Sequence, residues 1–313
     1  MPVIAYQSLN SNSSSTHSTT ASNSQFFTRM TQNRYGQNQA PSFLDHPIAQ
    51  DNSTPSNVAI QGPANLISPA PSGFMGKGNH TDSQFQSMVM DKSRQTHQVL
   101  IRELGTCDLL VYGELDGSSS DWQSMSQSTG TWIGGSSMSK ACNCFSAYAH
   151  NSNGVTKLAE NTGWVAFECT NVVIVFVHVP NAIASSKSSA HNFYRGIAYS
   201  LFQLNKRIDV IMGDTNQPSE HFTATVVSSA LSPSFAYATP TGAISPSDMF
   251  DVQMNGTNST ASKKYDVAIY NTQTVNVGKA IYLSQCTPTS HQNSSFSAAV
   301  TDHMGIGLKV TKK

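Results

Sequence analysis

Short apolar segments that end in polar side chains recur along the second part of this chain, and they limit what it can fold into. Residues 172–179 read VVIVFVHV, and residues 208–212 read IDVIM just before Gly213. Runs of this length that are rich in β-branched residues are typical of strands buried on both faces. Such strands need covering layers, so the chain must build sheets that lie between other elements.

Further elements follow from hydrophobic periodicity and from glycine stops. We expect helices over 94–104, which ends at Gly105, and over 191–204. Additional strands are expected over 107–112, 164–168, 266–270 and 307–310. This mixture of helices and strands predicts an α/β (α+β) fold of two packed mixed sheets with helices outside.

Residues 11–93 differ in composition from the rest of the chain, being rich in Ser, Thr, Asn, Gln and Pro. Segments of this kind bury too little apolar surface to offset their chain entropy, so we predict a low-complexity insertion or flexible segment. Phe26, Phe43 and Phe74 leave open that parts of it pack on a domain. The predicted organisation is a possible first strand in 1–10, this segment in 11–93, and a catalytic domain in 94–313.

Charge and cysteine content exclude some classes of protein. The 313 residues carry 18 basic and 18 acidic side chains, which argues against a general nucleic-acid coat protein but allows a local basic groove. Five cysteines are an odd number and do not suggest a disulfide framework, and Cys142 with Cys144 lacks the partners of a zinc site.

The first residues, MPVIAYQSLN, have no basic region and only a short apolar stretch, unlike a secretory signal. No apolar run approaches the roughly 20 residues that a membrane span needs. We therefore expect a soluble protein that is cytoplasmic or exported by a route that reads no cleaved signal.

Acidic, amide and histidine side chains gather at the ends of the predicted strands, where rigid elements present groups to a ligand. In chain order they are Glu114, His178, Asp214 with Asn216, Asp266, and Asp302 with His303. Each has an ordinary alternative when taken alone: Glu114 as a solvated loop residue with Asp116 competing for its role, and His178 as a hydrogen-bonded core residue. Asp214 and Asn216 alone are also typical of a turn.

Four short motifs follow one another along the chain: H-x-P at 178–180, G-D-x-N at 213–216, Y-D-x-x-I at 265–269 and D-H-x-x-I at 302–306. Together with D-L-L-x-x-x-E at 108–114, they resemble the endonuclease/exonuclease/phosphatase (DNase I-like) superfamily. The spacing is most similar to DNase I and to the catalytic subunit of cytolethal distending toxins. The resemblance covers 94–313 and a first strand within 3–10, and it implies a four-layered α/β/β/α sandwich.

The resemblance also implies roles for the polar residues. Mg²⁺ (or Mn²⁺) would be held by Glu114, Asp302 and Asn10, since hard cations prefer oxygen ligands. Asp214 would orient or deprotonate a water, and Asn216 would donate to a phosphate oxygen. The two histidines, His178 and His303, would act as acid, base or phosphate donor, and Asp266 would fix the tautomer of His303.

Three positions depart from the pattern of the superfamily. Thr215 stands where an aromatic residue is usual, and Ser8 stands where the first strand normally supplies a metal-holding Asn. The stretch KACNCFSAYAH has no acid to partner the first histidine, which leaves Asn143 and His150 as substitutes. Arg195 follows His178 on a predicted helix and is either a phosphate contact or a solvated residue.

The sequence therefore predicts a metal-dependent phosphodiester hydrolase, first of all a DNase I-like endonuclease that cuts DNA, such as a toxin or effector. The alternatives are a phosphoinositide phosphatase or sphingomyelinase-like phosphodiesterase of the same fold, with a lipid as partner. A binding protein on a catalytically decayed scaffold is a third hypothesis, motivated by Ser8 and by the missing acid.

Deleting residues 11–85 and joining Val3–Asn10 to the remainder through a short linker should leave a folded core, because loop entropy grows only slowly with loop length. Circular dichroism and thermal unfolding of the shortened chain would test this. Insoluble product from several such deletions would assign Phe26, Phe43 or Phe74 to the core.

Overall fold

The computed structural model describes residues 1–9, 96–98, 100–115, 117–125, 130–136, 144–241, 257, 263–283 and 303–313. The predicted segment 11–93 lies outside the described residues. So do four of the candidate site residues named from the sequence, namely Asn10, Asp116, Asn143 and Asp302.

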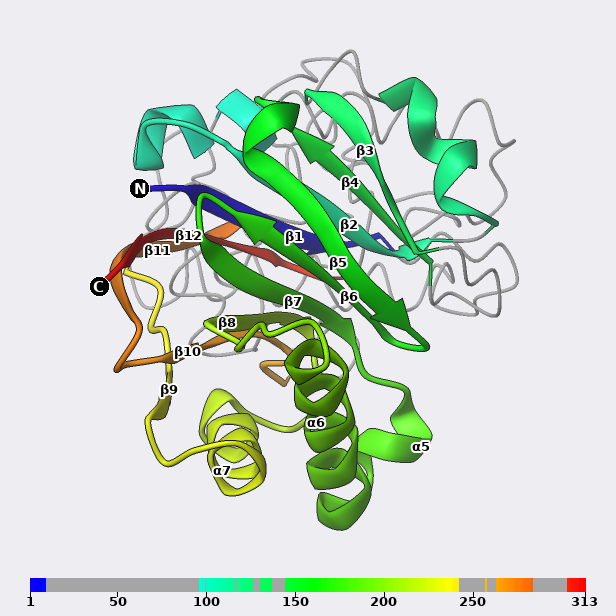
Figure 1. The fold of residues 1–313 in the computed structure, drawn as a ribbon, viewed down its shortest axis with the longest axis vertical. Helices are drawn as coiled ribbons and strands as arrows, with labels where there is room; N and C mark the ends of the chain where they lie inside the picture. Colours follow the sequence, from blue (N-terminus) through cyan, green and yellow to red (C-terminus); the bar gives the residue numbers. More distant parts are fainter. Residues whose placement is uncertain are drawn as a thin grey trace, which may run out of the picture.

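Two six-stranded mixed sheets face each other (Figure 1). The first sheet has the order β11-β12-β1-β2-β4-β3, with β1 (Val3–Ser8), β2 (Leu109–Leu115), β3 (Thr131–Gly135), β4 (Cys144–Ala149), β11 (Val275–Leu283) and β12 (Gly305–Lys312). The second has the order β5-β6-β7-β8-β10-β9, with β5 (Val155–Asn161), β6 (Trp164–Cys169), β7 (Val172–His178), β8 (Val210–Asp214), β9 (Phe235–Tyr237) and β10 (Asp266–Asn271).

Helices cover the outer faces of both sheets. On the second sheet, α5 (Asn181–Ala184), α6 (Lys187–Phe202) and α7 (Glu220–Ala230) pack over a buried apolar layer. On the first sheet, Leu100 and Leu104 of the helical segment 96–104, together with the 3₁₀ helix η4 (Ser119–Met125), cover the outer face. A second 3₁₀ turn, η5 (Ser152–Gly154), leads into β5. The predicted α/β/β/α sandwich is therefore confirmed.

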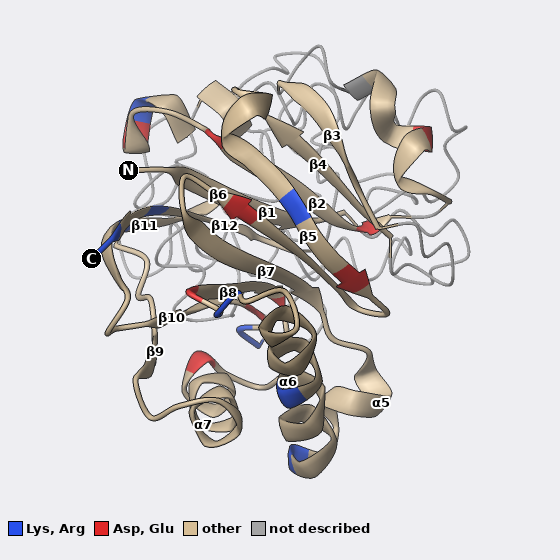
Figure 2. Cartoon of the chain, viewed as in Figure 1, with Lys and Arg blue, Asp and Glu red and all other residues tan. Residues whose placement is uncertain are grey.

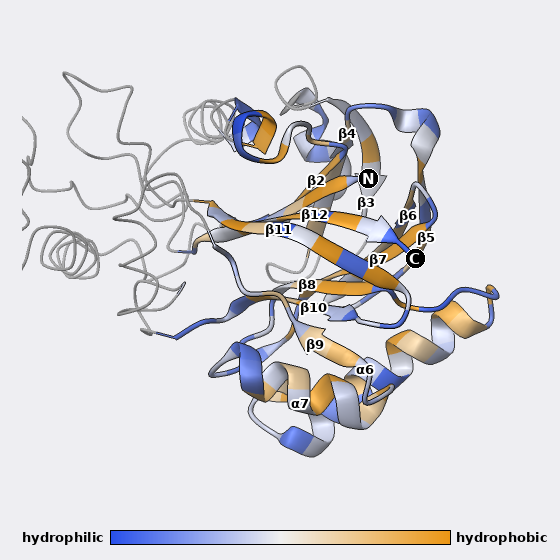
Figure 3. Ribbon diagram, turned by 90° about the vertical axis from the view of Figure 1, so that its left-hand side faces the viewer, coloured by the Kyte–Doolittle hydropathy of each residue, from blue (hydrophilic) through white to orange (hydrophobic). Residues whose placement is uncertain are grey.

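The interior between the sheets is apolar and dominated by aromatic rings. Tyr6 of β1 lies 6.3 Å from Phe176 of β7 and 6.5 Å from Phe145 of β4, measured between ring centroids. Phe167 meets Phe176 edge to face at 6.1 Å. All four side chains are fully buried, and Figure 3 shows the apolar strands stacked between the more polar helices and turns. Aromatic pairs of this kind add to the free energy that apolar burial supplies.

Two central pairs of parallel strands bring polar residues to one edge of the sandwich. β1 runs parallel to β2, with Ser8 opposite Gly113, and β7 runs parallel to β8, with His178 opposite Asp214. The carboxyl ends of both pairs open on one side of the sandwich. Asp266 was expected at the end of a strand, but it begins β10. Because β10 is antiparallel to β8, Asp266 lies opposite Asp214 and so reaches the same edge.

Some predicted boundaries shift, and several elements were missed. Helix α6 begins at Lys187 rather than 191, because Ser186 caps it by accepting a hydrogen bond from Ser189 N at 3.3 Å. Helix α7 is likewise capped by Ser219, and its Thr- and Ser-rich sequence hid it. Strands β3, β5 and β11 carry too many partly exposed positions to stand out as apolar runs.

Among the described residues, no helix is both long enough and apolar enough to cross a membrane.

Gly213 in G-D-x-N is required by the fold. Its φ is +140°, and an added Cβ would lie 2.1 Å from the carbonyl oxygen of Val177 on the neighbouring strand. We expect Gly213→Ala to lower stability by at least about 1–3 kcal/mol through backbone strain alone. Gly196→Ala on exposed α6, where an added Cβ meets nothing within 4 Å, should instead stabilise by about 0.5–1 kcal/mol. Urea unfolding of both variants checks this, and equal effects would contradict it.

Candidate active site

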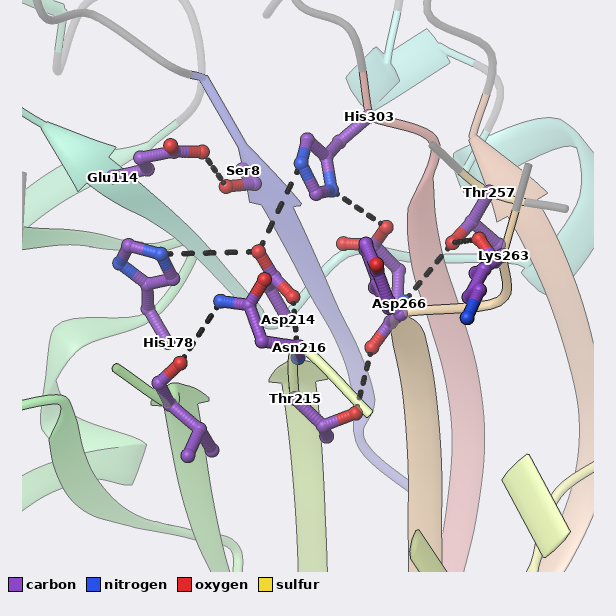
Figure 4. A network of polar contacts seen from close by, with 12 residues as sticks. Ser8, Glu114, His178, Asp214, Thr215, Asn216, Thr257, Lys263, Asp266 and His303 are labelled. Carbon is purple, nitrogen blue, oxygen red and sulfur yellow. Dashed lines mark hydrogen bonds and ion pairs between the residues drawn. The ribbon is translucent and has the colours of Figure 1, made fainter. Parts of the chain in front are cut away.

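The carboxylate of Asp214 lies at the centre of the polar edge (Figure 4). Its Oδ2 atom is 3.8 Å from Nε2 of His178 and also 3.8 Å from Nε2 of His303. These separations are too long for direct hydrogen bonds, and a water or another small polar group can bridge the carboxylate and a ring at such a distance. The end of β7 and the segment just before β12 (His303), far apart in the sequence, thus bring their histidines to one carboxylate.

The turn after β8 holds Asp214 in place. Asn216 N donates to Asp214 Oδ1 at 2.8 Å, and Asn216 Nδ2 donates to the Val179 carbonyl at 2.9 Å. Asn216 has φ 51°, in the left-handed region that a non-glycine residue adopts at a cost. The Asn216 side chain therefore joins the turn to the end of β7.

His303 and Asp266 form a buried pair. Nδ1 of His303 lies 2.8 Å from Oδ2 of Asp266, and the side chains are 6% and 0% exposed. With the proton on Nδ1, this bond leaves the Nε2 lone pair of a neutral ring directed toward Asp214. Gln7 of β1 adds a second restraint, since its Nε2 donates to the His303 carbonyl at 2.8 Å.

Burial and charge act against each other on Asp266. Complete burial raises the pKa of Asp266 above its usual range, while the charge of His303 and its hydrogen bond lower it. The Oδ1 atom of Asp266 has no hydrogen-bond partner within the described part of the chain. The ring of His303 is therefore the main group that stabilises the ionised carboxylate, and the Thr257 hydroxyl contributes less.

The edge concentrates negative charge. Burial raises the pKa of Tyr6 well above its ordinary value, and the nearby carboxylates of Asp214, Asp266 and Glu114 raise it further. Both recorded ion pairs of Asp214, and that of Asp266, are with histidines, not with Lys or Arg. Such a site favours a bound cation.

Glu114 projects from an irregular part of β2. The register between β2 and β4 shifts between Tyr112 and Leu115, and Glu114 has φ 56°. A bulge of this kind re-aims a side chain at a strand end. Ser8 Oγ donates to Glu114 Oε2 at 2.6 Å, so the serine at the expected Asn position fixes the carboxylate.

The donor set fits a divalent cation. One potential ligand atom each from Glu114, His178 and Asp214 lies within 4.8 Å of the other two. Two carboxylates suit Mg²⁺ or Mn²⁺, and the imidazole nitrogen is better suited to Mn²⁺ than to Mg²⁺. This grouping differs from the predicted ligand set, of which only Glu114 is described.

The structure brings together most of the polar residues that the sequence singled out. Glu114, His178, Asp214, Asn216, Asp266 and His303 line one edge. Asp302 and Asn10 lie outside the described residues. His150 is wrong as the substitute partner of His178: it follows β4 at the end opposite the site, where its ring lies 6.5 Å from that of His97.

Three residues at this edge were not predicted. Gln7 restrains His303, and the Thr257 hydroxyl accepts a hydrogen bond from Asp266 N at 3.0 Å. The carbonyl of Tyr265 accepts hydrogen bonds from Thr215 N at 2.9 Å and from Thr215 Oγ1 at 3.0 Å, and burial and then the charge of Asp214 raise the pKa of the Tyr265 hydroxyl. Only Tyr265 carried a sequence signal, as the first residue of Y-D-x-x-I.

Comparisons with known proteins give likenesses in structure alone. No protein-family model matches the chain, and no curated protein sequence matches it. Solved structures do match: an endonuclease/exonuclease/phosphatase family protein from Bacteroides thetaiotaomicron is 12% identical with a TM-score of 0.46, over 74% of this chain and 90% of that one. A mannosyl-6-phosphatase from the same organism is 11% identical with a TM-score of 0.46, over 74% and 95%.

A third match is an AP endonuclease from Archaeoglobus fulgidus, 9% identical with a TM-score of 0.44, over 70% of this chain and 95% of that one. The first of these descriptions names the superfamily that the sequence motifs resemble. At these levels of identity and overlap, the case for function rests on the geometry of the site.

The His303–Asp266 pair gives a double-mutant prediction. Asp266→Asn and His303→Ala should each reduce hydrolysis by about 10²–10⁴-fold, the usual contribution of a positioned acid or base. Adding Asp266→Asn to His303→Ala should cost little more, because residues that act as a unit are not additive. His178→Ala should lose a similar factor. Turnover numbers would be measured with circular dichroism as the fold control, and multiplicative losses would contradict the coupling.

Proposed function

We propose that this protein is a divalent-metal-dependent phosphoester hydrolase of the endonuclease/exonuclease/phosphatase type, with DNA phosphodiesters as its substrate. The observation that carries the proposal is the placement of Asp214 Oδ2 at 3.8 Å from both histidine Nε2 atoms, with Asp266 orienting one ring. A carboxylate between two imidazoles suits a reaction in which a water is activated beside an anionic, tetrahedral group.

In the proposed reaction, Asp214 orients a water and accepts a proton as the water oxygen forms a bond to phosphorus. The bond between phosphorus and the leaving oxygen breaks, and that oxygen leaves with the electron pair and takes up a proton from protonated His178 or His303. The other histidine, when protonated, donates a hydrogen bond to a phosphoryl oxygen and offsets its charge. Asp266 stabilises the imidazolium form of His303, with which it shares the bond of 2.8 Å.

A bound divalent cation would neutralise phosphate charge and stabilise the leaving oxygen. Glu114, already held by Ser8, would be its first ligand. His178 or Asp214 would contribute where their atoms converge with that of Glu114. Asp302 and Asn10 remain proposed ligands on the strength of the resemblance.

DNA is proposed as the substrate because the motif series resembles DNase I and the toxin subunit. A DNA-damaging toxin or effector role has the same support. A plasmid-nicking assay with Mg²⁺, Mn²⁺ and EDTA, run beside phosphate release from phosphoinositides and cleavage of sphingomyelin, separates the candidate substrates. Nicking that stops in EDTA is expected. Full activity in EDTA excludes the metal, and turnover of lipid alone excludes DNA.

Glu114→Gln should raise the metal concentration needed for half-maximal activity, because removing the charge weakens a cation ligand while keeping the side-chain shape. Glu103→Gln is the matched control, since Glu103 binds Lys279 outside the site. Metal titrations of nicking by both variants provide the measurement. An unchanged titration for Glu114→Gln would assign the role to Asp116 or Asn10.

A further inference from the structure

A second hollow lies away from the candidate active site. It has a volume of about 480 Å³ and is lined by the C-terminal part of α6, the segment leading into β8, the end of α7 and the turn between β10 and β11. The segment before β8 is at the opposite end of that strand from Asp214, roughly 15 Å away at about 3.3 Å per residue. A volume of this size is in the range of small-molecule sites.

Two large aromatic side chains stand exposed at this hollow. Tyr199 and Phe202 line it and are 67% and 63% exposed, which is unusual for side chains of their size. They come from neighbouring turns of α6, three residues apart, so they lie on one face of the helix. Exposed rings of this kind provide stacking surfaces for a flat apolar group.

The hollow is also positively charged. Arg195 and Arg207 line it, and both are exposed. Lys206 lines it as well but is paired with Glu168 at 2.6 Å. No acidic residue is among those that line it, and α6 itself carries basic but no acidic side chains (Figure 2). Asp209 nearby is fully buried and bonds Val173 N, Thr274 and Lys312.

Amide side chains complete the lining. Asn271 and Gln273 come from the β10–β11 turn, where Asn271 Oδ1 accepts a hydrogen bond from Gln273 N at 3.0 Å. Amide groups of this type can pair with the edge of a nitrogenous base. Stacking rings, two guanidinium groups and amides therefore occur around one volume.

We propose that this hollow is a nucleotide-binding site separate from the catalytic edge. A base stacks on Tyr199 and Phe202, and the phosphate is bound by Arg195 and Arg207, whose planar forks match phosphate oxygens. The amides of the β10–β11 turn contact the edge of the base. Charge complementarity selects an anionic occupant, and the hollowed shape selects a small one over an extended membrane surface. The inference does not depend on the proposed hydrolase activity.

Calorimetric titration of the full chain with adenosine 5′-monophosphate at about 0.15 M salt and in EDTA tests the proposal, since chelation prevents metal-dependent binding at the catalytic edge. Arg195→Ala with Arg207→Ala should weaken binding at least about tenfold, as expected for charged hydrogen bonds. Tyr199→Ala with Phe202→Ala should do the same. Lys187→Ala, an exposed cation on the same helix, should change affinity less than about twofold.

Asp214→Asn should leave the binding of the nucleotide intact, which separates this site from the proposed hydrolase. Adenosine and inorganic phosphate should each bind more weakly than the nucleotide. The proposal is overturned by no saturable binding, by loss in Asp214→Asn with none in the arginine variant, or by inorganic phosphate binding as tightly as the nucleotide. Arginine-dependent sedimentation with vesicles of phosphatidylserine, without nucleotide binding, would identify a membrane contact instead.

Discussion

The packing of Tyr6 against Phe145 and Phe176 is the contact on which the rest of the structure depends. The contact with Phe176 joins the central strand β1 of one sheet to the central strand β7 of the other, and Phe145 of β4 packs on Tyr6 from within the same sheet, all three rings being fully buried. Since β1–β2 and β7–β8 are both parallel pairs, this contact makes their carboxyl ends open on one side. Loss of that alignment would separate Glu114 from Asp214 without altering either strand.

The candidate site lowers the stability of the folded protein, and favourable interactions in the surrounding structure must offset this loss. Glu114 and Asn216 adopt positive φ values, and Gly213 lies against the backbone of Val177. Several carboxylates lie close together around the buried hydroxyl of Tyr6. Strained backbone and gathered like charges both destabilise a folded protein, and they persist where a rigid scaffold holds them. A bound cation would relieve the electrostatic part of this cost.

The restraints on the two histidines differ. His303 is fixed through its ring by Asp266 and through its backbone by Gln7. His178 continues the hydrogen bonding of β7, its N–H donating to the Gly163 carbonyl at 2.9 Å. The ring of His303 is therefore oriented by a buried carboxylate, and the ring of His178 lies beside Asp214, with its Nε2 atom 3.8 Å from Oδ2.

The sequence by itself determined the apolar strands and the order of the polar groups at their ends, because β-branched runs and the residues that flank them are local features. The sequence could not show that His150 follows β4 at the end far from the candidate active site, or that Gln7 restrains His303. It also could not show that Arg195 lines a second hollow. Those facts depend on strand order, register and helix packing, which join residues far apart in the chain. Only the tertiary structure decided which side chains share a site.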